Sequence, residues 1–211
     1  MQDILLPLFP LELVLLPSNP LPLHIFEDRY KELIGEAIQN NTEFGIVQAK
    51  EKGILNLGCT ASVDKVVKAY PDGRMDILTQ GRRRFEIFSI DDERPFLRGT
   101  VQFFDDEDFA EPAPETRLTA LACFELLRRE EDPGRTPPAM NDPYLSFKIA
   151  EPVADLAFRQ TLLSMRSEGE RLAYINQFLP DYLASLKRLT HIRKVAPRNG
   201  HGFIALGKKP E

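Results

Sequence analysis

The spacing of apolar residues along the chain predicts a strand-rich first half that contains one early helix. From Phe26 onward, apolar residues recur at the 3.6-residue spacing of an amphipathic helix, at Tyr30, Leu33, Ile34, Ala37 and Ile38. Glu27 and Asp28 suit the positive N-terminal end of its dipole. Asn40 and Asn41 predict where it ends. We therefore expect a single helix near the start of the chain.

Short runs with the character of β-strands follow this helix. They begin at Phe44, Cys59, Arg74, Arg84 and Phe96. Between the second and third runs, Pro71-Asp72-Gly73 predicts a hairpin, because proline presets one turn dihedral and glycine tolerates positive φ. Several short strands separated by turns favour a small antiparallel barrel over a parallel sheet.

The second half is predicted to be helical and to follow a connector. Residues 105–115 are rich in acid and proline and have no periodicity, so we expect them to separate a β-rich unit, 1–110, from a helical unit, 111–211. Apolar spacing predicts helices over 118–127, 150–165 and 170–192. The last carries an apolar stripe at Leu172, Ile175, Leu179, Tyr182, Leu183, Leu186 and Leu189. Pro180 should kink or split it.

These elements predict an α+β protein, with a β-rich barrel that contains one early helix and a helical bundle after it. A composition of 43% hydrophobic and 28% charged residues is typical of globular proteins. No apolar run approaches the roughly 20 residues of a membrane helix, and the N-terminus does not resemble a signal peptide. Cys59 and Cys123 form no C-x-x-C pattern. We expect a cytoplasmic protein without disulfide, metal or membrane partner.

Charge argues against a general nucleic-acid binder. Residues 1–110 carry 12 Lys/Arg against 19 Asp/Glu, a net charge of −7, whereas residues 111–211 carry 15 against 13, a net charge of +2. Phosphate contacts supply most of the affinity of such binders, so a basic face would be expected. Only the basic stretch near the C-terminus offers one, at Lys187, Arg188, Arg193 and Lys194. Contact of this stretch with RNA stays open as the alternative function.

Three fragments imitate catalytic motifs. Gly202 to Lys209 approaches the phosphate-binding loop G-x-x-x-x-G-K-[ST] without its hydroxyl or a following helix. The S-x-x-K spacing of Ser62 and Lys65 requires a helix, but this segment is predicted as a strand, where the two side chains point to opposite faces. The three histidines, His24, His191 and His201, form no H-E-x-x-H pair. We therefore expect no catalytic residue, no cofactor and no metal ligand.

Two further groups of residues suit binding. Arg82-Arg83-Arg84 could contact phosphate or an acidic partner, but charge patterning favours a solvated turn offset by Asp91, Asp92 and Glu93. Prolines stiffen the segment from Pro20 to Phe26 and lower the entropy lost on binding, so an apolar peptide could lie along it. The competing interpretation is an edge strand that the prolines protect, with Leu21, Leu23 and Ile25 pointing into the core.

The opening segment LPLFPLELVLLPSNPLPLHIFEDRYKELIGEAI resembles the N-terminal hallmark of the Lon substrate-binding domain family. The motifs that follow in order are FGIV from Phe44, Gly58-Cys59-Thr60-Ala61, and GRRRFEI from Gly81. AFRQTLLSMRSEGERLAYINQFL is similar to the family's helix pair. The resemblance spans nearly the whole chain and implies a PUA-like pseudobarrel followed by a helical subdomain. The chain departs from the family pattern at Ser18-Asn19, where glycine-methionine is common, and at Asp28, where proline is common.

The resemblance implies a recognition module that binds protein segments. Full-length Lon proteases also carry an ATPase module and a Ser-Lys peptidase domain, for which 211 residues leave no room, so we expect a non-catalytic binder. Its expected partners are unfolded or apolar protein segments and a separate protease that it serves as an adaptor in protein quality control. We expect the segment to lie in a crevice between the two halves, against Pro20, Leu21, Pro22, Leu23, His24 and Phe26. The oligomeric state is left open.

Overall fold

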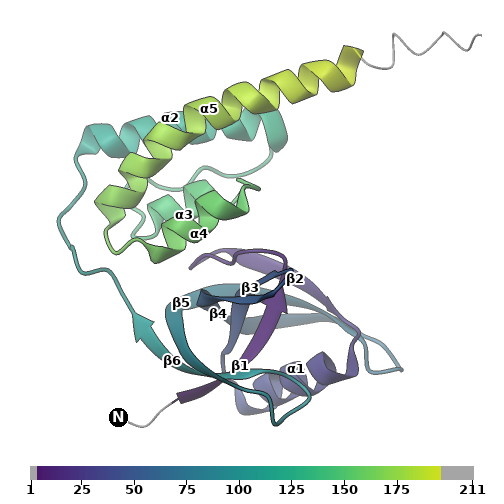
Figure 1. Cartoon of the computed structure of the whole chain (residues 1–211). Helices are drawn as coiled ribbons and strands as arrows, with labels where there is room; N and C mark the ends of the chain where they lie inside the picture. The colour runs from purple at the N-terminus through teal and green to yellow at the C-terminus, as the bar shows by residue number, and fades with distance from the viewer. Residues whose placement is uncertain (1–3, 196–211) are drawn as a thin grey trace, which may run out of the picture.

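The structure, a computed structural model, describes residues 4–195, without the side chains of Ile4, residues 190–191 and residues 193–195. The elements are β1 (Ile4–Leu11), β2 (Pro20–Ile25), α1 (Asp28–Asn40), β3 (Phe44–Lys50), β4 (Gly53–Ala69), β5 (Met75–Asp91), β6 (Arg98–Phe104), α2 (Pro114–Glu131), α3 (Leu145–Ala150), α4 (Leu156–Ser164) and α5 (Glu168–Val195). Figure 1 shows the strands and α1 below the other four helices. The predicted α+β class is confirmed.

The six strands form one sheet that closes on itself. Their order is β2-β5-β4-β3-β1-β6, and β6 also pairs with β5. Neighbouring strands are antiparallel except β1 and β3, which pair in parallel from Leu8 to Leu11. The barrel predicted from the spacing of the strands is therefore present, with one parallel pair added. β2 lies at an open edge, because β5 is its sole neighbour in the strand order.

The strand prediction differs from the structure at three places: β1 was not predicted, β2 was predicted only as the competing interpretation of Pro20 to Phe26, and two predicted runs form one strand. β1 and β2 contain prolines, which argue against a strand interior when the pairing partners are not known. The runs from Arg74 and Arg84 belong to the single strand β5, which continues through Gly81. Bulges in β4 and β5 bend these long strands around the barrel. The turn predicted at Pro71-Asp72-Gly73 is confirmed, with Gly73 at φ 83°.

The early helix α1 packs on the barrel as its pattern predicts. Tyr30, Leu33, Ile34 and Ala37 are buried, and Asn41 ends the helix in the left-handed region. Inside the barrel, Leu6, Leu8, Val47, Phe85 and Val101 form a small core. A Cβ atom on Gly58 would lie 2.5 Å from the tip of the Phe85 ring, so this strand position needs glycine.

The helical half differs from its prediction at two places. The helix expected over 150–165 begins only at Leu156, as α4, because the chain turns at residues 151–155 and Asp155 accepts a hydrogen bond from the Phe158 amide at 2.8 Å. The short helix α3 precedes this turn. α5 continues through Pro180 instead of splitting. Leu179 and Leu183, on either side of this proline, are buried, so tertiary packing outweighs one lost hydrogen bond. Leu189, at the far end of the predicted stripe, is exposed.

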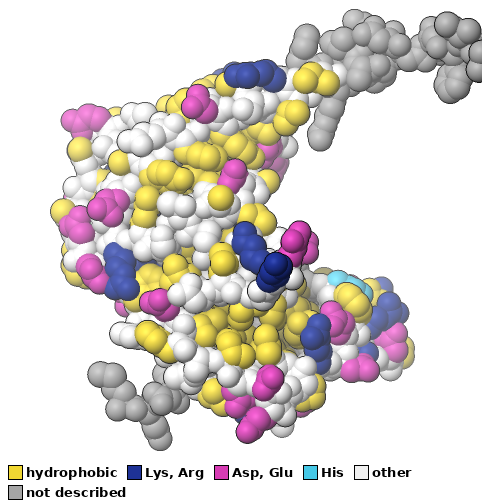
Figure 2. Space-filling model, in the orientation of Figure 1, with side chains coloured by type: hydrophobic (Ala, Val, Ile, Leu, Met, Phe, Trp, Pro, Cys, Tyr) yellow, Lys and Arg dark blue, Asp and Glu magenta, His cyan; other side chains and the backbone are white. Residues whose placement is uncertain are grey.

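The two halves share one apolar core. It joins α1 and barrel residues to those of α2–α5 through Val14, Leu15 and Leu16, which lie in the loop between β1 and β2. Arg159 of α4 donates a hydrogen bond to the Val14 carbonyl at 2.9 Å, so this loop lies against the helical half. Figure 2 shows that the surface is concave between the two halves. The division into units 1–110 and 111–211 stays a prediction.

Candidate functional site

The segment from Pro20 to Phe26 forms the edge strand β2 and the residue after it. Pro20, Pro22 and His24 are exposed, whereas Leu21 and Leu23 are half-buried against the core. Proline has no amide hydrogen to donate, so these prolines suit the open edge of the sheet and weaken it as a template for aggregation. Phe26, immediately after the strand, keeps 59% of its surface exposed.

At the far end of β2, an exposed aromatic cluster surrounds Asp76. His24 lies 2.5 Å from one carboxylate oxygen of Asp76, and the Tyr70 hydroxyl donates to the other at 2.8 Å. The rings of His24 and Phe26 stack with their centroids 5.9 Å apart. Because of the hydrogen bonds from His24 and Tyr70, the pKa of Asp76 lies below its ordinary value. A histidine and an aspartate meet here, but we identify no nucleophile beside them among the described residues.

The crevice between the halves contains a cavity of about 200 Å³. Residues of the loop between β1 and β2, of β5, of the connector between β6 and α2, and of the helical half line it: Pro17, Arg82, Arg83, Arg84, Asp105, Asp106, Phe109, Pro143, Tyr144, Phe147 and Arg171. The segment from Pro20 to Phe26 does not line this cavity, and its role in binding stays a prediction. The six residues of β2 span about 20 Å, which carries Phe26 away from it.

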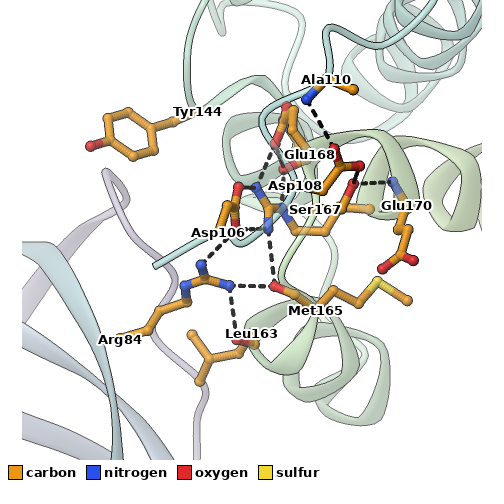
Figure 3. Close-up of polar contacts among 12 residues, drawn as sticks. Arg84, Asp106, Asp108, Ala110, Tyr144, Leu163, Met165, Ser167, Glu168 and Glu170 are labelled. Atoms are coloured by element: carbon orange, nitrogen blue, oxygen red, sulfur yellow. Dashed lines mark hydrogen bonds and ion pairs between the residues drawn. The ribbon is translucent and has the colours of Figure 1, made fainter. Parts of the chain in front are cut away.

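Arg84, Asp106 and Arg171, which line this cavity, belong to a buried ionic network. Figure 3 shows its contacts. Asp106 accepts hydrogen bonds from Arg84 at 2.6 Å and from both terminal nitrogens of Arg171 at 2.7 and 2.6 Å. Arg171 also donates to Glu168 at 2.8 Å and to the Ser146 hydroxyl at 2.9 Å. The network joins β5, the connector, α3 and α5, and so fixes one half against the other.

The network keeps its carboxylate charged despite burial. Burial by itself would raise the pKa of Asp106, but the guanidinium groups of Arg171 and Arg84 outweigh it and hold this pKa below its ordinary value. Burial lowers the pKa of Arg84, whereas the carboxylates of Asp106 and Glu168 raise that of Arg171. Because an arginine pKa is far above neutral, both arginines remain charged in the folded protein.

These findings correct the interpretation of Arg82-Arg83-Arg84. The triplet lies inside β5 rather than at a solvated turn, and its acidic partners are not those expected from the neighbouring sequence. Arg82 pairs with Asp64 and Arg83 with Glu43, each at 3.1 Å. Arg84 is 5% exposed and pairs with Asp106. All three partners come from elements that the tertiary fold brings beside β5.

Two exposed aromatic residues on the cavity wall were not predicted. Phe109 is 84% exposed and Tyr144 is 47% exposed. In Figure 3 the Tyr144 ring lies to one side of the network, without a polar contact to it. The acid-rich sequence around Phe109 and the proline-rich sequence around Tyr144 were interpreted only as loops. The sequence feature that could have indicated their exposure is an aromatic residue isolated within a polar loop.

The departure from the family pattern at Ser18-Asn19 falls in the loop between β1 and β2, at two positions that suit glycine and an apolar residue. Ser18 has φ 64°, in the left-handed region that favours glycine. Asn19 is 1% exposed, and neither polar atom of its side chain has a hydrogen-bond partner among the described residues. An apolar side chain such as methionine would suit this position better, because a buried polar group without a partner is costly.

The other predicted binding residues lie on α5. Lys187 and Arg188 are exposed, whereas the side chains of Arg193 and Lys194 lie outside the described residues, as does His201 with the segment from Gly202 to Lys209. On the face in Figure 2, acidic and basic side chains are interspersed. None of the described helices is long and apolar enough to cross a membrane.

Two further candidates for chemistry in the described part of the chain are the S-x-x-K fragment and Cys59. Ser62 and Lys65 lie on β4, as predicted, and the Ser62 hydroxyl bonds Asp64 and Arg82 instead of Lys65. Among the described side chains, no group of His, Cys, Asp or Glu residues could hold a metal ion. Cys59 is fully buried, which raises the pKa of its thiol to about 12 and leaves it unreactive.

Comparison with known proteins relates this chain to one family of domains. The family model for the ATP-dependent protease La (LON) substrate-binding domain matches residues 5–181. The Lon protease of Parabacteroides distasonis is 30% identical over 110 residues, which cover 48% of this chain and 13% of that protein. The Lon protease of Escherichia coli strain K12 is 22% identical over 209 residues, or 91% of this chain and 26% of that protein. The chain thus spans at most about a quarter of these relatives.

Solved structures share the fold. A Lon N-terminal domain protein from Xanthomonas campestris aligns with a TM-score of 0.68 and 22% identity, over 83% of this chain and 98% of that one. The N-terminal domain of the Lon protease from the Mycobacterium avium complex aligns with a TM-score of 0.62 and 18% identity, over 84% and 99% of the two chains. The mixed fold, with a large sheet followed by helices, is therefore that of these N-terminal domains.

Proposed function

Because the chain belongs to the Lon substrate-binding domain family, we propose that it is a non-catalytic module that binds unfolded or apolar segments of other proteins. In this proposal it presents such segments to a separate protease as an adaptor in protein quality control. The proposed contact residues are Pro20, Leu21, Pro22, Leu23, His24 and Phe26.

The exposure of Phe26 carries this proposal. An aromatic side chain that is 59% exposed, beside the open edge of a sheet, leaves apolar surface available to a partner. Pro20 and Pro22 stiffen the neighbouring strand, so little conformational entropy is lost when a segment binds along it. The stacking of Phe26 on His24 holds the ring in place before binding.

The experiment replaces Phe26 and measures binding and stability together. The wild type should bind a short fluorescein-labelled peptide rich in Leu and Phe, and Phe26→Ala should weaken this binding about tenfold or more, as expected for an exposed aromatic anchor. The melting temperature should stay almost unchanged, because Phe26 is not in the core. Fluorescence anisotropy gives the affinity and calorimetry the melting temperature.

Phe88→Ala is the matched control, since Phe88 is 64% exposed and lies on β5 away from β2. Equal binding by the wild type and Phe26→Ala would remove Phe26 from the site. No binding of any apolar peptide to the wild type would overturn the proposed function itself. A peptidase assay on the same samples tests the non-catalytic part, and turnover of a fluorogenic peptide would contradict it.

RNA binding is the second candidate, supported by the exposure of Lys187 and Arg188 on α5. If these residues contact phosphates, RNA affinity should fall steeply with salt, and neutralising Lys187, Arg188, Arg193 and Lys194 should abolish it. RNA affinity that is insensitive to these four substitutions would exclude this candidate.

A further inference from the structure

A row of aromatic rings follows one side of α5 in the helical half, outside the cavity between the halves. Tyr174, Phe178 and Tyr182 recur every four residues, which places them on the same side of a helix. The Phe178 ring stacks on that of Phe158 in α4, with their centroids 4.1 Å apart. The centroid of Phe178 also lies 6.3 Å from that of Tyr174 and 5.6 Å from that of Tyr182. Phe158 is buried, whereas the three rings of α5 are half-buried and so present part of their surface to solvent.

A groove of about 540 Å³ lies along these three rings. Residues of α5 and the residue that precedes α4 line it: Asp155, Tyr174, Gln177, Phe178, Asp181, Tyr182 and Ser185. Its two sides are fixed to each other, because the Ala154 amide donates a hydrogen bond to the Tyr182 hydroxyl at 3.2 Å. The Asp155 carboxylate accepts another from the Phe158 amide at 2.8 Å. The groove therefore exists before any partner binds, which reduces the entropy lost on binding.

The lining of this groove carries only negative charge. Two carboxylates belong to it, those of Asp155 and Asp181, and no described lysine or arginine does. Among the described residues, the Asp181 carboxylate has no hydrogen bond or ion pair, and that of Asp155 has none beyond the backbone amide that it caps. Lys187 and Arg188 follow on α5 beyond Ser185, the last residue of the lining. The charge of the lining therefore favours a cationic partner.

A third acid adds negative charge at the Tyr182 end of the groove. Burial raises the pKa of the Tyr182 hydroxyl, and the charges of Glu131 and Asp155 raise it further, so both carboxylates lie near this hydroxyl. Arg135, whose charge acts on Glu131, is already paired with Glu151 at 2.8 Å. A partner that brings a positive charge would therefore meet carboxylates that have no ion-pair partner among the described residues.

We propose that this groove docks a Lys or Arg side chain of a partner protein, with apolar neighbours of that residue lying against the three rings. Aromatic rings attract cations as well as apolar groups. The carbon stem of a long basic side chain covers ring surface while its charged end reaches a carboxylate. An acidic segment or a nucleic acid would bring negative charge to the same carboxylates and be repelled. The groove does not include the segment from Pro20 to Phe26, so the inference goes beyond the proposed function and stands without it.

Three labelled peptides test this assignment on the full chain, with fluorescence anisotropy as the readout. They share one apolar sequence and differ only at a central position, which is Lys, norleucine or Glu. In low salt the Lys peptide should bind about tenfold more tightly than the norleucine peptide, and the Glu peptide most weakly. Asp181→Asn should lower this preference for Lys to about threefold or less. Its melting temperature should stay almost unchanged, because the Asp181 carboxylate makes no contact that the fold needs.

Further variants separate the groove from other surfaces. Phe178→Leu keeps an apolar side chain but removes the central ring, and should weaken the Lys and norleucine peptides alike, about threefold or more. Asp92→Asn removes an exposed acid on the turn between β5 and β6 and should leave the preference for Lys unchanged. Phe26→Ala, which tests the proposed function, should leave it unchanged as well, so the two proposals fail independently.

The groove assignment is wrong if the Lys and norleucine peptides bind equally, if the Glu peptide binds best, or if Asp92→Asn lowers the preference as much as Asp181→Asn. It is also wrong if Phe26→Ala abolishes the preference, because the basic residue would then be recognised at β2. Absence of binding by all three peptides would overturn the docking surface. Spermidine that binds in that case, and depends on Asp181, would assign the groove to a small cation instead of a protein.

Discussion

Replacing Asp106 should lower the stability of the protein markedly, because its carboxylate joins the two halves through buried ion pairs. It lies on the connector and neutralises two arginines, Arg84 and Arg171, which are 5% and 2% exposed. Asp106→Ala would leave both guanidinium groups in place with fewer partners. Arg84 would keep only carbonyl acceptors, at Met165 and Leu163. Arg171 would keep Glu168, Ser146 and the Met165 carbonyl.

The magnitude follows from the number of contacts and their burial. Removing one partner of a buried ion pair costs about 3–5 kcal/mol, largely because the other charge stays buried. Asp106 makes three charge-assisted hydrogen bonds, but its side chain is 22% exposed and Arg171 retains Glu168. We therefore expect Asp106→Ala to lower the free energy of unfolding by about 3 kcal/mol, at the lower end of that range.

Urea denaturation is the suitable assay, because guanidinium salts would screen the ion pairs. Asp92→Ala, which removes an exposed acid on the turn after β5, should change the free energy of unfolding by less than about 0.5 kcal/mol. The double variant Arg84→Met/Asp106→Ala should lose less free energy of unfolding than the sum of the two single variants, because it no longer buries the unpaired Arg84 charge. A loss below about 1 kcal/mol for Asp106→Ala would refute the assigned role.

The lowered pKa of Asp106 also predicts how the stability of the protein depends on pH. Because the folded pKa of Asp106 is lowered, its contribution is complete above the unfolded value of about 3.9 and is lost as pH falls through the folded value. The stability difference between the wild type and Asp106→Asn should therefore be constant near neutral pH and shrink below about pH 4. A difference that grows on acidification would contradict the sign of the shift.

Two further predictions concern the loop between β1 and β2. Asn19→Leu should raise the free energy of unfolding by about 1–2 kcal/mol in urea, because it removes a buried amide without partners; a loss of stability would indicate a hidden partner. Gly81→Ala should lower the free energy of unfolding by about 3 kcal/mol, because the new Cβ would lie 2.2 Å from the Leu16 carbonyl oxygen. Gly35→Ala in α1 is the control and should be neutral or stabilising, because a Cβ there meets nothing within 4 Å. Equal effects of the two glycine changes would contradict the close approach at Gly81.

The candidate site was predicted only in part. The exposed positions of β2 alternate with half-buried ones, as the edge-strand interpretation requires, and a crevice does lie between the halves. Its aromatic wall was missed, because nothing in the sequence near Phe109 or Tyr144 indicates that the two loops meet. Whether Phe26 is exposed could not be predicted either, since an aromatic residue between a strand and a helix suits the core equally well.

Sequence by itself determined the features that depend on neighbouring residues. The spacing from Tyr30 to Ala37 specifies a helix face, and Pro71-Asp72-Gly73 specifies a turn, because local backbone preferences and periodicity suffice for both. Tertiary structure alone decided which charges meet. Arg82, Arg83 and Arg84 are adjacent in sequence, yet their partners come from β4, from the residue before β3 and from the connector. Ion pairs between distant segments depend on strand register and on the path of the chain, and neither is encoded by any short stretch.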